Sequence, residues 1–209
     1  MEMYSYIITR DFGFAPNPFG EFCTLATCKP SIRKIAKIGD WVIATGPKTF
    51  YNKQGYLFLA MKVEEKLTFN EYWKDERFQY KKPVFNGSLK QCFGDNIYVL
   101  GEENKVWHQQ DSHHSLDGGE INKRNLKNDT KSPYVLISKQ FYYFGKGNIE
   151  IPNSLKSELC NRWRFPLYKL IKKEIAQKCI QWLETSFEKG IQEEPMEFEK
   201  GFKRFDGKS

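Results

Sequence analysis

The sequence predicts an α+β fold, with a strongly curved mixed β-sheet or barrel in the first two-thirds of the chain and helices flanking and following it. Short aromatic and β-branched runs recur up to residue 144, Gly and Pro separate them, and a long amphipathic pattern appears only after residue 152. With 209 residues, 40% of them hydrophobic, the chain can bury the core of one domain. We expect this domain at 1–150, a helical extension packed on it at 151–190, and a flexible tail at 191–209.

The N-terminal half supplies most of the expected strands. A strand at 4–9 (YSYIIT) precedes a loop rich in Pro, Gly and Phe, and a helix follows at 29–38. Pro30 suits the first turn of that helix and Gly39 suits its end. Strands are expected next at 41–45 (WVIAT) and 56–63 (YLFLAMKV), and a short helix at 68–80.

The rest of the chain changes from strands to helices. A strand is expected at 95–100, followed by a polar stretch at 101–132 whose length is typical of a functional loop. Strands at 134–138 and 140–144 close the β-rich part. Helices are expected at 155–163 and 167–187, and the second carries an apolar stripe. We expect that helix to dock on the sheet; a protein partner or a second copy of the chain in a homodimer is the alternative.

The charge balance favours a polyanionic partner. The net charge of +7 points to nucleotides or nucleic acid. The densest basic run, KPSIRKIAK, holds Lys29, Arg33, Lys34 and Lys37 without an acidic residue, and these four are the expected phosphate contacts. A solvated helix face explains the same run equally well.

Cysteine usage and hydropathy predict a cytoplasmic protein with no membrane partner. The five cysteines include no CxxC pair, which is typical of free thiols in a reducing compartment. The first residues lack the pattern of a signal peptide, and no apolar stretch has the length of a membrane span.

All three histidines fall within one short window, VWHQQDSHHS. His108, Asp111, His113 and His114 are therefore the candidates for acid–base catalysis. The same residue types also ligate metals, but the spacing matches no zinc module, and further ligands such as Cys23 or Cys28 would be needed. A hydrogen-bonded structural loop is the third interpretation. We assign no metal site and leave the cofactor open.

The loop after the first strand is the second candidate site. Arg10 and Asp11 directly follow the strand, and Asn17 lies between two prolines that fix its backbone. Its amide would be able to read a base edge, while Phe14 and Phe19 would stack on the base. The alternative is a surface Arg10–Asp11 pair above a hydrophobic plug.

Four runs resemble one protein family: SYIITRDFGFAPNPF, CTLATCKPSIRKIAKIGDWVIATG, WHQQDSHHS and VLISKQFYYFG. Together they look like the second type of nucleotide modification associated domain, a group of prokaryotic and phage proteins, over roughly residues 3–150. The order of elements resembles, more distantly, the PUA-like barrels of the EVE, ASCH and YTH domains. The resemblance implies a nucleotide or modified-base ligand and a role in DNA modification or defence.

Three classes of function follow from these features. The leading hypothesis is a binding module in which a base stacks on Phe14, Phe19 or Trp41. Arg10, Asp11, Asn17, His113 and His114 complete its expected ligand-binding residues. The rival is a nucleotide hydrolase or base-modifying enzyme that uses the histidine window, with or without a metal. The third is an interaction protein that docks through its C-terminal helix. In the first two cases the first loop and the histidine window must meet around one ligand, and we predict that they do.

Overall fold

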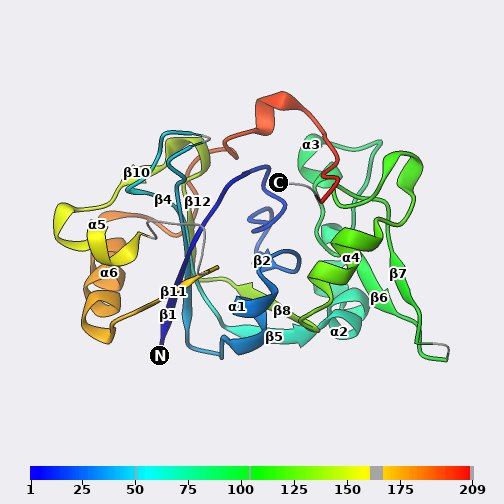
Figure 1. The fold of residues 1–209 in the computed structure, drawn as a ribbon, viewed down its shortest axis with the longest axis horizontal. Coiled ribbons are helices and arrows are strands. Elements are labelled where there is room, and N and C mark those ends of the chain that lie inside the picture. The colour runs from blue at the N-terminus through cyan, green and yellow to red at the C-terminus, as the bar shows by residue number, and fades with distance from the viewer. Residues whose placement is uncertain (50, 104, 161–166, 208–209) are drawn as a thin grey trace.

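The computed structural model describes residues 1–49, 51–103, 105–160 and 167–207, which form a mixed α+β fold (Figure 1). Its largest sheet has seven strands in the order β11-β1-β3-β4-β9-β12, with β10 also paired to β4. β1 runs parallel to β3 and β12 parallel to β9, whereas the other pairs are antiparallel. The strands are β1 (Met3–Ile7), β3 (Trp41–Thr45), β4 (Tyr56–Lys62), β9 (Phe141–Tyr143), β10 (Ile149–Glu150), β11 (Lys169–Ile171) and β12 (Gly190–Ile191).

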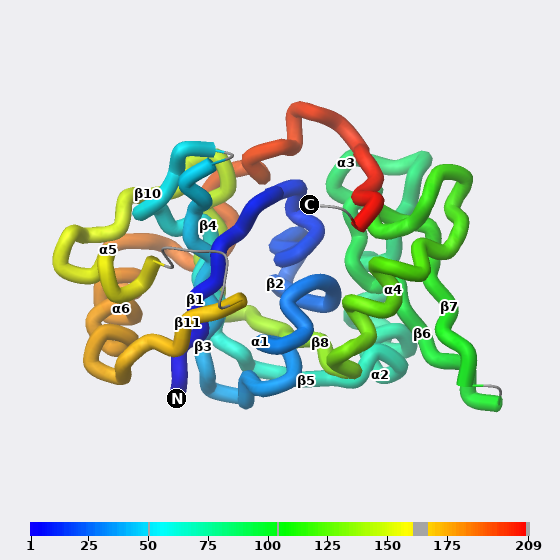
Figure 2. Tube along the Cα trace, in the orientation of Figure 1, coloured from blue at the N-terminus to red at the C-terminus, as the bar shows by residue number. Residues whose placement is uncertain are grey.

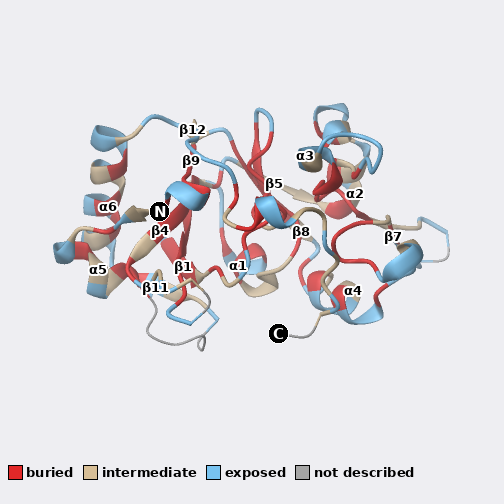
Figure 3. Cartoon of the chain, turned by 90° about the horizontal axis from the view of Figure 1, so that it is seen from above, coloured by how far each residue is buried: buried red, intermediate tan, exposed pale blue. Residues whose placement is uncertain are grey.

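Both faces of this sheet are buried, which explains its nearly continuous apolar strands. Alternate residues of one strand join different cores, because successive side chains point to opposite faces. Tyr4 and Val42 lie in one core with α1 (Pro30–Ile35), whereas Met3 and Ile43 lie in another. That second core includes apolar side chains from α5 (Asn153–Leu159) and α6 (Lys173–Ser186), so α6 packs on the sheet as expected (Figure 3).

A second lobe lies on the other side of α1 from α5 and α6 (Figures 1 and 2). It holds a three-stranded sheet of β2 (Cys23–Leu25), β8 (Tyr134–Ser138) and β5 (Glu65–Thr68), and a hairpin of β6 (Tyr98–Leu100) and β7 (Trp107–Gln109). Its helices are α2 (Phe69–Lys74), α3 (Leu89–Cys92) and α4 (Lys123–Asp129), with 3-10 turns η1 (Glu76–Lys81) and η2 (Asp117–Gly119). A third core, rich in Phe, fills this lobe.

Three expected features differ from the structure. The described strands do not close into a barrel, because the main sheet ends at the edge strands β11 and β12. The polar stretch at 101–132 is not one long loop, since it contains β7, η2 and α4. The expected helix at 68–80 is divided, because α2 ends at Lys74 and the backbone of Asp75 is extended; the Asp75 side chain accepts from Arg77 N–H and caps η1.

The C-terminal helical region also differs at its beginning. Residues expected in the long helix form β11, which pairs with the edge of β1, and α6 begins only at Lys173. The expected helix at 155–163 ends earlier, at Leu159, and its last residues lie outside the described part of the chain.

The described residues after β12 form a strap between the two lobes. After β12, the chain lies against the earlier 3-10 turn η3 (Gly145–Gly147). It then forms η4 (Phe198–Lys200) and crosses to the second lobe (Figures 1 and 2). Phe198 and Phe202 pack into the Phe-rich core. Apolar contacts, which the charged composition of the tail did not predict, therefore hold it in place.

Across the described ranges, no helix combines the length and the apolar character required to traverse a lipid bilayer.

Candidate functional site

A cleft of about 590 Å³ opens where the two lobes and the strap meet. Its walls come from the end of β1 and the following loop, the start of α1, the histidine window, α4 and the strap. The lining includes the side chains of Arg10, Phe12, Phe14, Cys28, Lys29, His113, His114, Arg124, Lys127, Lys131, Tyr168 and Phe205.

The first loop and the histidine window meet in this cleft, which confirms the predicted encounter. The ring of Phe14 lies 5.0 Å from that of His113 and 4.7 Å from that of His114, measured between centroids. Phe12 lies 5.1 Å from His113. Rings from the loop thus form a wall against both imidazoles.

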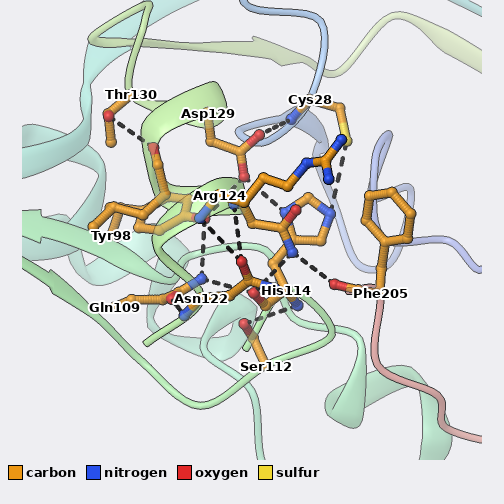
Figure 4. A network of polar contacts seen from close by, with 12 residues as sticks. Cys28, Tyr98, Gln109, Ser112, His114, Asn122, Arg124, Asp129, Thr130 and Phe205 are labelled. Atoms are coloured by element: carbon orange, nitrogen blue, oxygen red, sulfur yellow. Dashed lines mark hydrogen bonds and ion pairs between the residues drawn. The ribbon is translucent and has the colours of Figure 1, made fainter. Parts of the chain in front are cut away.

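Three side chains from distant parts of the chain form a linked series beside the cleft (Figure 4). The Sγ atom of Cys28 lies 3.8 Å from Nε2 of His114. The other ring nitrogen, Nδ1, donates a 2.7 Å hydrogen bond to Oδ2 of Asp129. The hydroxyl of Tyr98 donates to the same carboxylate oxygen at 2.9 Å. The series runs thiol, imidazole, carboxylate, and each ring nitrogen has a different neighbour.

The two adjacent histidines differ in charge because their surroundings shift their pKa values in opposite directions. Burial opposes the imidazolium form of His114, but the charges of Asp129 and Cys28 outweigh it and raise the pKa of His114 to about 10. Burial also opposes ionisation of Asp129, yet His114 and Arg33 hold the pKa of this carboxyl below its ordinary value. For His113, burial and then the charge of His114 lower the pKa to about 3. At neutral pH, His114 is therefore protonated and His113 is neutral.

Cys28 occupies a constrained turn between a strand and a helix. Cys28 and Lys29 have φ values of 55° and 38°, in the left-handed region that costs a non-glycine residue about 1–3 kcal/mol. The backbone N–H of Cys28 donates to Oδ1 of Asp129 at 2.8 Å. The Nε of Arg33 donates to the carbonyl oxygen of Cys28, also at 2.8 Å. These two bonds hold the turn and set the position of the thiol.

Arg33 ties this turn to the segment that carries Asp129. Its guanidinium is fully buried and also donates to the carbonyl oxygens of Ser132 at 3.2 Å, Tyr134 at 2.6 Å, and Asp129. Arg33 is therefore a structural cation rather than the expected phosphate contact, because every face of it is enclosed by protein.

The strap forms one edge of the cleft. The backbone N–H of Phe205 donates to the carbonyl oxygen of His113 at 2.7 Å, and Nδ1 of His113 is hydrogen-bonded to the carbonyl oxygen of Lys203. The Asn125 amide donates to the Phe205 carbonyl oxygen at 2.6 Å. The guanidinium of Arg10 lies 4.9 Å above the Phe205 ring. The strap therefore orders His113 and places one aromatic ring at the cleft.

Four residues expected to contact the ligand are instead buried away from the cleft. The Asn17 amide donates to the Phe93 carbonyl oxygen, and its oxygen accepts from Lys81, so no part of it is available to a base. The Asp11 carboxylate accepts from Tyr143 and from the backbone of Met196. Phe19 packs on Phe198, and Trp41 packs on Tyr142.

Other expected residues face different surfaces. His108 is exposed on β7, and Asp111 forms an ion pair with Arg204 of the strap. Lys34 and Lys37 are exposed near Lys66 and Tyr134, on a separate shallow surface. Among the four expected phosphate contacts, the structure places only Lys29 at the cleft, because α1 exposes the next two lysines in another direction.

The cleft contains residues that the sequence did not single out. Arg124 and Lys127 lie three residues apart on one face of α4, and Lys131 follows in the turn after the helix ends. Asp129 lies on the same segment but is buried. Helical spacing within the polar stretch was the available signal for these cations, but the assignment of that stretch to a loop concealed it.

Cys28, His114 and Asp129 are also the described residues whose ligand atoms lie close enough for a metal, all within 4.8 Å of one another. Both oxygens of Asp129 already accept hydrogen bonds. Oδ1 accepts from the backbone N–H of Cys28, and Oδ2 accepts from the Tyr98 hydroxyl and the His114 ring. A histidine binds a metal through one nitrogen, and a carboxylate on its other nitrogen orients the ring. Only two ligands, the thiol and Nε2, therefore face a common point, and this fits a metal poorly.

The family model for nucleotide modification associated domain 2 matches residues 1–202. The chain belongs to this family. The match extends beyond the region at 3–150 that carries the sequence resemblance, and includes α5, α6 and the beginning of the strap. Membership of the nucleotide modification associated domain 2 family associates the protein with nucleotide modification. No curated protein and no solved structure matches the chain.

Proposed function

We propose that the cleft binds a nucleotide, either free or as one unit of a nucleic acid strand, and recognises its base in a DNA modification or defence pathway of a prokaryote or phage. The observation that carries this proposal is the charge of the cleft. Its described lining includes five exposed or half-buried cations, Arg10, Lys29, Arg124, Lys127 and Lys131, and no acidic residue. Such a lining attracts phosphate and repels cationic ligands.

The aromatic wall suits the other half of a nucleotide. Phe12, Phe14, Tyr168 and Phe205 offer ring faces or edges within the same cleft. Stacking on an aromatic ring contributes about 1–3 kcal/mol per base. The volume of about 590 Å³ lies in the range typical of small-molecule pockets. Recognition of a modified base, the role implied by the PUA-like resemblance, is one form of this proposal.

Two of the cleft cations, Lys127 on α4 and Lys131 just after it, provide a test of nucleotide binding. We expect the paired substitution Lys127→Glu and Lys131→Glu to weaken binding of a single-stranded oligonucleotide by roughly tenfold or more, since two phosphate-facing charges are reversed. The slope of log K against log salt should fall by about 0.7 for each phosphate that the variant no longer neutralises. Fluorescence anisotropy with labelled DNA and RNA strands, and calorimetry with nucleoside monophosphates, measure these effects and separate the possible ligands.

A matched control uses the lysines on the other surface. The pair Lys34→Glu and Lys37→Glu makes the same change in net charge outside the cleft. It should alter affinity through long-range charge alone, so its effect should be small at physiological salt. Equal reductions in affinity for the two pairs would show that the cleft is not the binding site.

A further inference from the structure

The series Cys28–His114–Asp129 has the arrangement of a nucleophile, a general acid–base and an orienting carboxylate. The thiol lies 3.8 Å from Nε2 of His114, and Nδ1 of the same ring lies 2.7 Å from Asp129. In catalytic triads the carboxylate fixes the tautomer and direction of the ring while the opposite nitrogen serves the nucleophile. The separate use of the two nitrogens of His114 matches these roles.

The thiol is the most exposed member of the series. Cys28 is half-buried and lines the cleft, whereas His114, which also lines it, is 3% exposed and Asp129 is fully buried. Of the other cysteines, Cys23 and Cys179 are fully buried. A ligand in the cleft would therefore meet Cys28 with the edge of His114 beside it, and Asp129 enclosed behind them.

The turn that carries Cys28 adds an independent indication. A sharp, strained turn between strand and helix also presents the nucleophile in hydrolases of unrelated fold. Here Asp129 and Arg33 both bond to the backbone of Cys28, so Asp129, which also orients His114, helps to fix the nucleophile. Strain of this kind persists only where surrounding contacts enforce it.

We propose that Cys28 is the nucleophile of a hydrolytic activity in this cleft, with His114 as general acid and base and Asp129 as the group that orients it. The substrate class is a nucleotide whose base carries an acylated amino group. The choice of nucleotide rests on the proposed function, whereas the activated thiol does not.

The reaction needs only water as co-reactant. The Cys28 thiolate forms a bond to the amide carbon, and the π electrons of the carbonyl move to its oxygen. The electrons return, the C–N bond breaks, and the leaving amine takes the proton of the His114 imidazolium. Neutral His114 then removes a proton from water, and the resulting hydroxide attacks the thioester carbon. Cleavage of the C–S bond releases the carboxylic acid and restores the thiolate–imidazolium pair.

Alkylation by iodoacetamide tests the thiol without any substrate. We expect iodoacetamide at about pH 6 to alkylate Cys28 about tenfold or more faster in the folded wild-type chain than in the urea-unfolded chain, because only the folded chain holds the positively charged His114 beside the sulfur. Fragment-ion mapping separates Cys28 from Cys23, which shares its tryptic peptide. An equal or slower rate for Cys28 in the folded chain overturns the nucleophile.

Variants assign the effect to the series. His114→Gln should slow alkylation of Cys28 at about pH 6 by about tenfold or more, and Cys92→Ser should leave it unchanged. If His114→Gln does not fold, the comparison between folded and unfolded wild type still decides. A metal ion bound stoichiometrically that blocks alkylation until a chelator removes it also overturns the proposal.

Turnover tests the substrate class. The probe is a deoxycytidine monophosphate acetylated on its exocyclic amine, with release of acetate followed by chromatography. Cys28→Ala should reduce turnover by about a thousandfold or more while it still binds the probe. If wild type alkylates rapidly and binds the probe but leaves it intact, the acyl substrate is wrong and the nucleophile stands. If Cys28 alkylates rapidly but no nucleotide binds or protects it, the proposed function fails instead.

Discussion

Replacing Arg33 with methionine is expected to lower the free energy of unfolding by about 3–5 kcal/mol, because the variant leaves buried carbonyl groups without a donor. The guanidinium is fully buried and donates to the backbone of Cys28, Asp129, Ser132 and Tyr134. Methionine fills a similar volume but donates no hydrogen bond. Urea denaturation followed by circular dichroism measures the change.

The matched control for Arg33 is its neighbour on the same helix. Lys34→Met removes an exposed cation from α1 and should change stability by about 0.5 kcal/mol or less. If the two variants proved equally stable, water would have to hydrate the carbonyl groups that Arg33 now occupies, and its structural role would be wrong.

Arg33 also explains how a site can form between segments far apart in the chain. It holds the carbonyl of Cys28 on the β2–α1 turn and that of Asp129 at the end of α4. These residues are 101 positions apart, and the N–H of Cys28 bonds directly to the Asp129 side chain. The distance between thiol and imidazole is therefore set by a buried cation that touches neither of them.

Local pattern was sufficient to predict most of the large sheet. β3, β4 and β9 fall within expected strands and β1 overlaps one, as β8 of the smaller sheet also does, because their apolar and aromatic runs are short and bounded by turn residues. β11 was not predictable in the same way. Its residues continue the apolar stripe of α6, and the free edge of β1 draws them into the sheet instead.

The candidate site was predictable only in part. That the first loop and the histidine window would meet was predictable, because the polar and aromatic groups of each segment would have to converge on one ligand. The pairing of His114 with Asp129 carries no such signal, since Asp129 is one carboxylate within a polar stretch. From the sequence, Cys28 was recognisable only as a possible metal ligand, because a thiol becomes a candidate nucleophile only when an imidazole lies beside it.

The Lys29–Lys37 run shows why composition is insufficient to locate a charged surface. The helix of six residues within this run buries Arg33, while Lys29 before it lines the cleft and Lys34 and Lys37 lie on another surface. Three of the cations that line the cleft come from α4 and the turn after it. Helix orientation, which tertiary packing decides, therefore determines which charges act together.

Asp129→Asn is expected to lower the free energy of unfolding by about 3–5 kcal/mol at neutral pH, because it removes one partner of a buried ion pair. The variant keeps the shape of the side chain but leaves His114 without its counter-charge and disturbs the bond from Tyr98. Asp117→Asn, on an exposed side chain, is the control and should change stability by about 0.5 kcal/mol or less. Equal effects of the two substitutions would contradict a buried ion pair.

The same variant should also change how stability depends on pH. In the wild type the pKa of His114 is raised to about 10, above its unfolded value, so its contribution is complete below about pH 6.5 and disappears as pH rises toward 10. The contribution of Asp129, whose pKa is lowered, is instead lost in acid. Without the carboxylate, His114 should be neutral when folded, and the decline of stability with rising pH should vanish.

Urea midpoints of both proteins between about pH 6 and pH 9 measure this pH dependence. Subtracting one curve from the other removes the contribution of groups common to both proteins, such as Lys81. Parallel curves would show that Asp129 does not control the charge of His114.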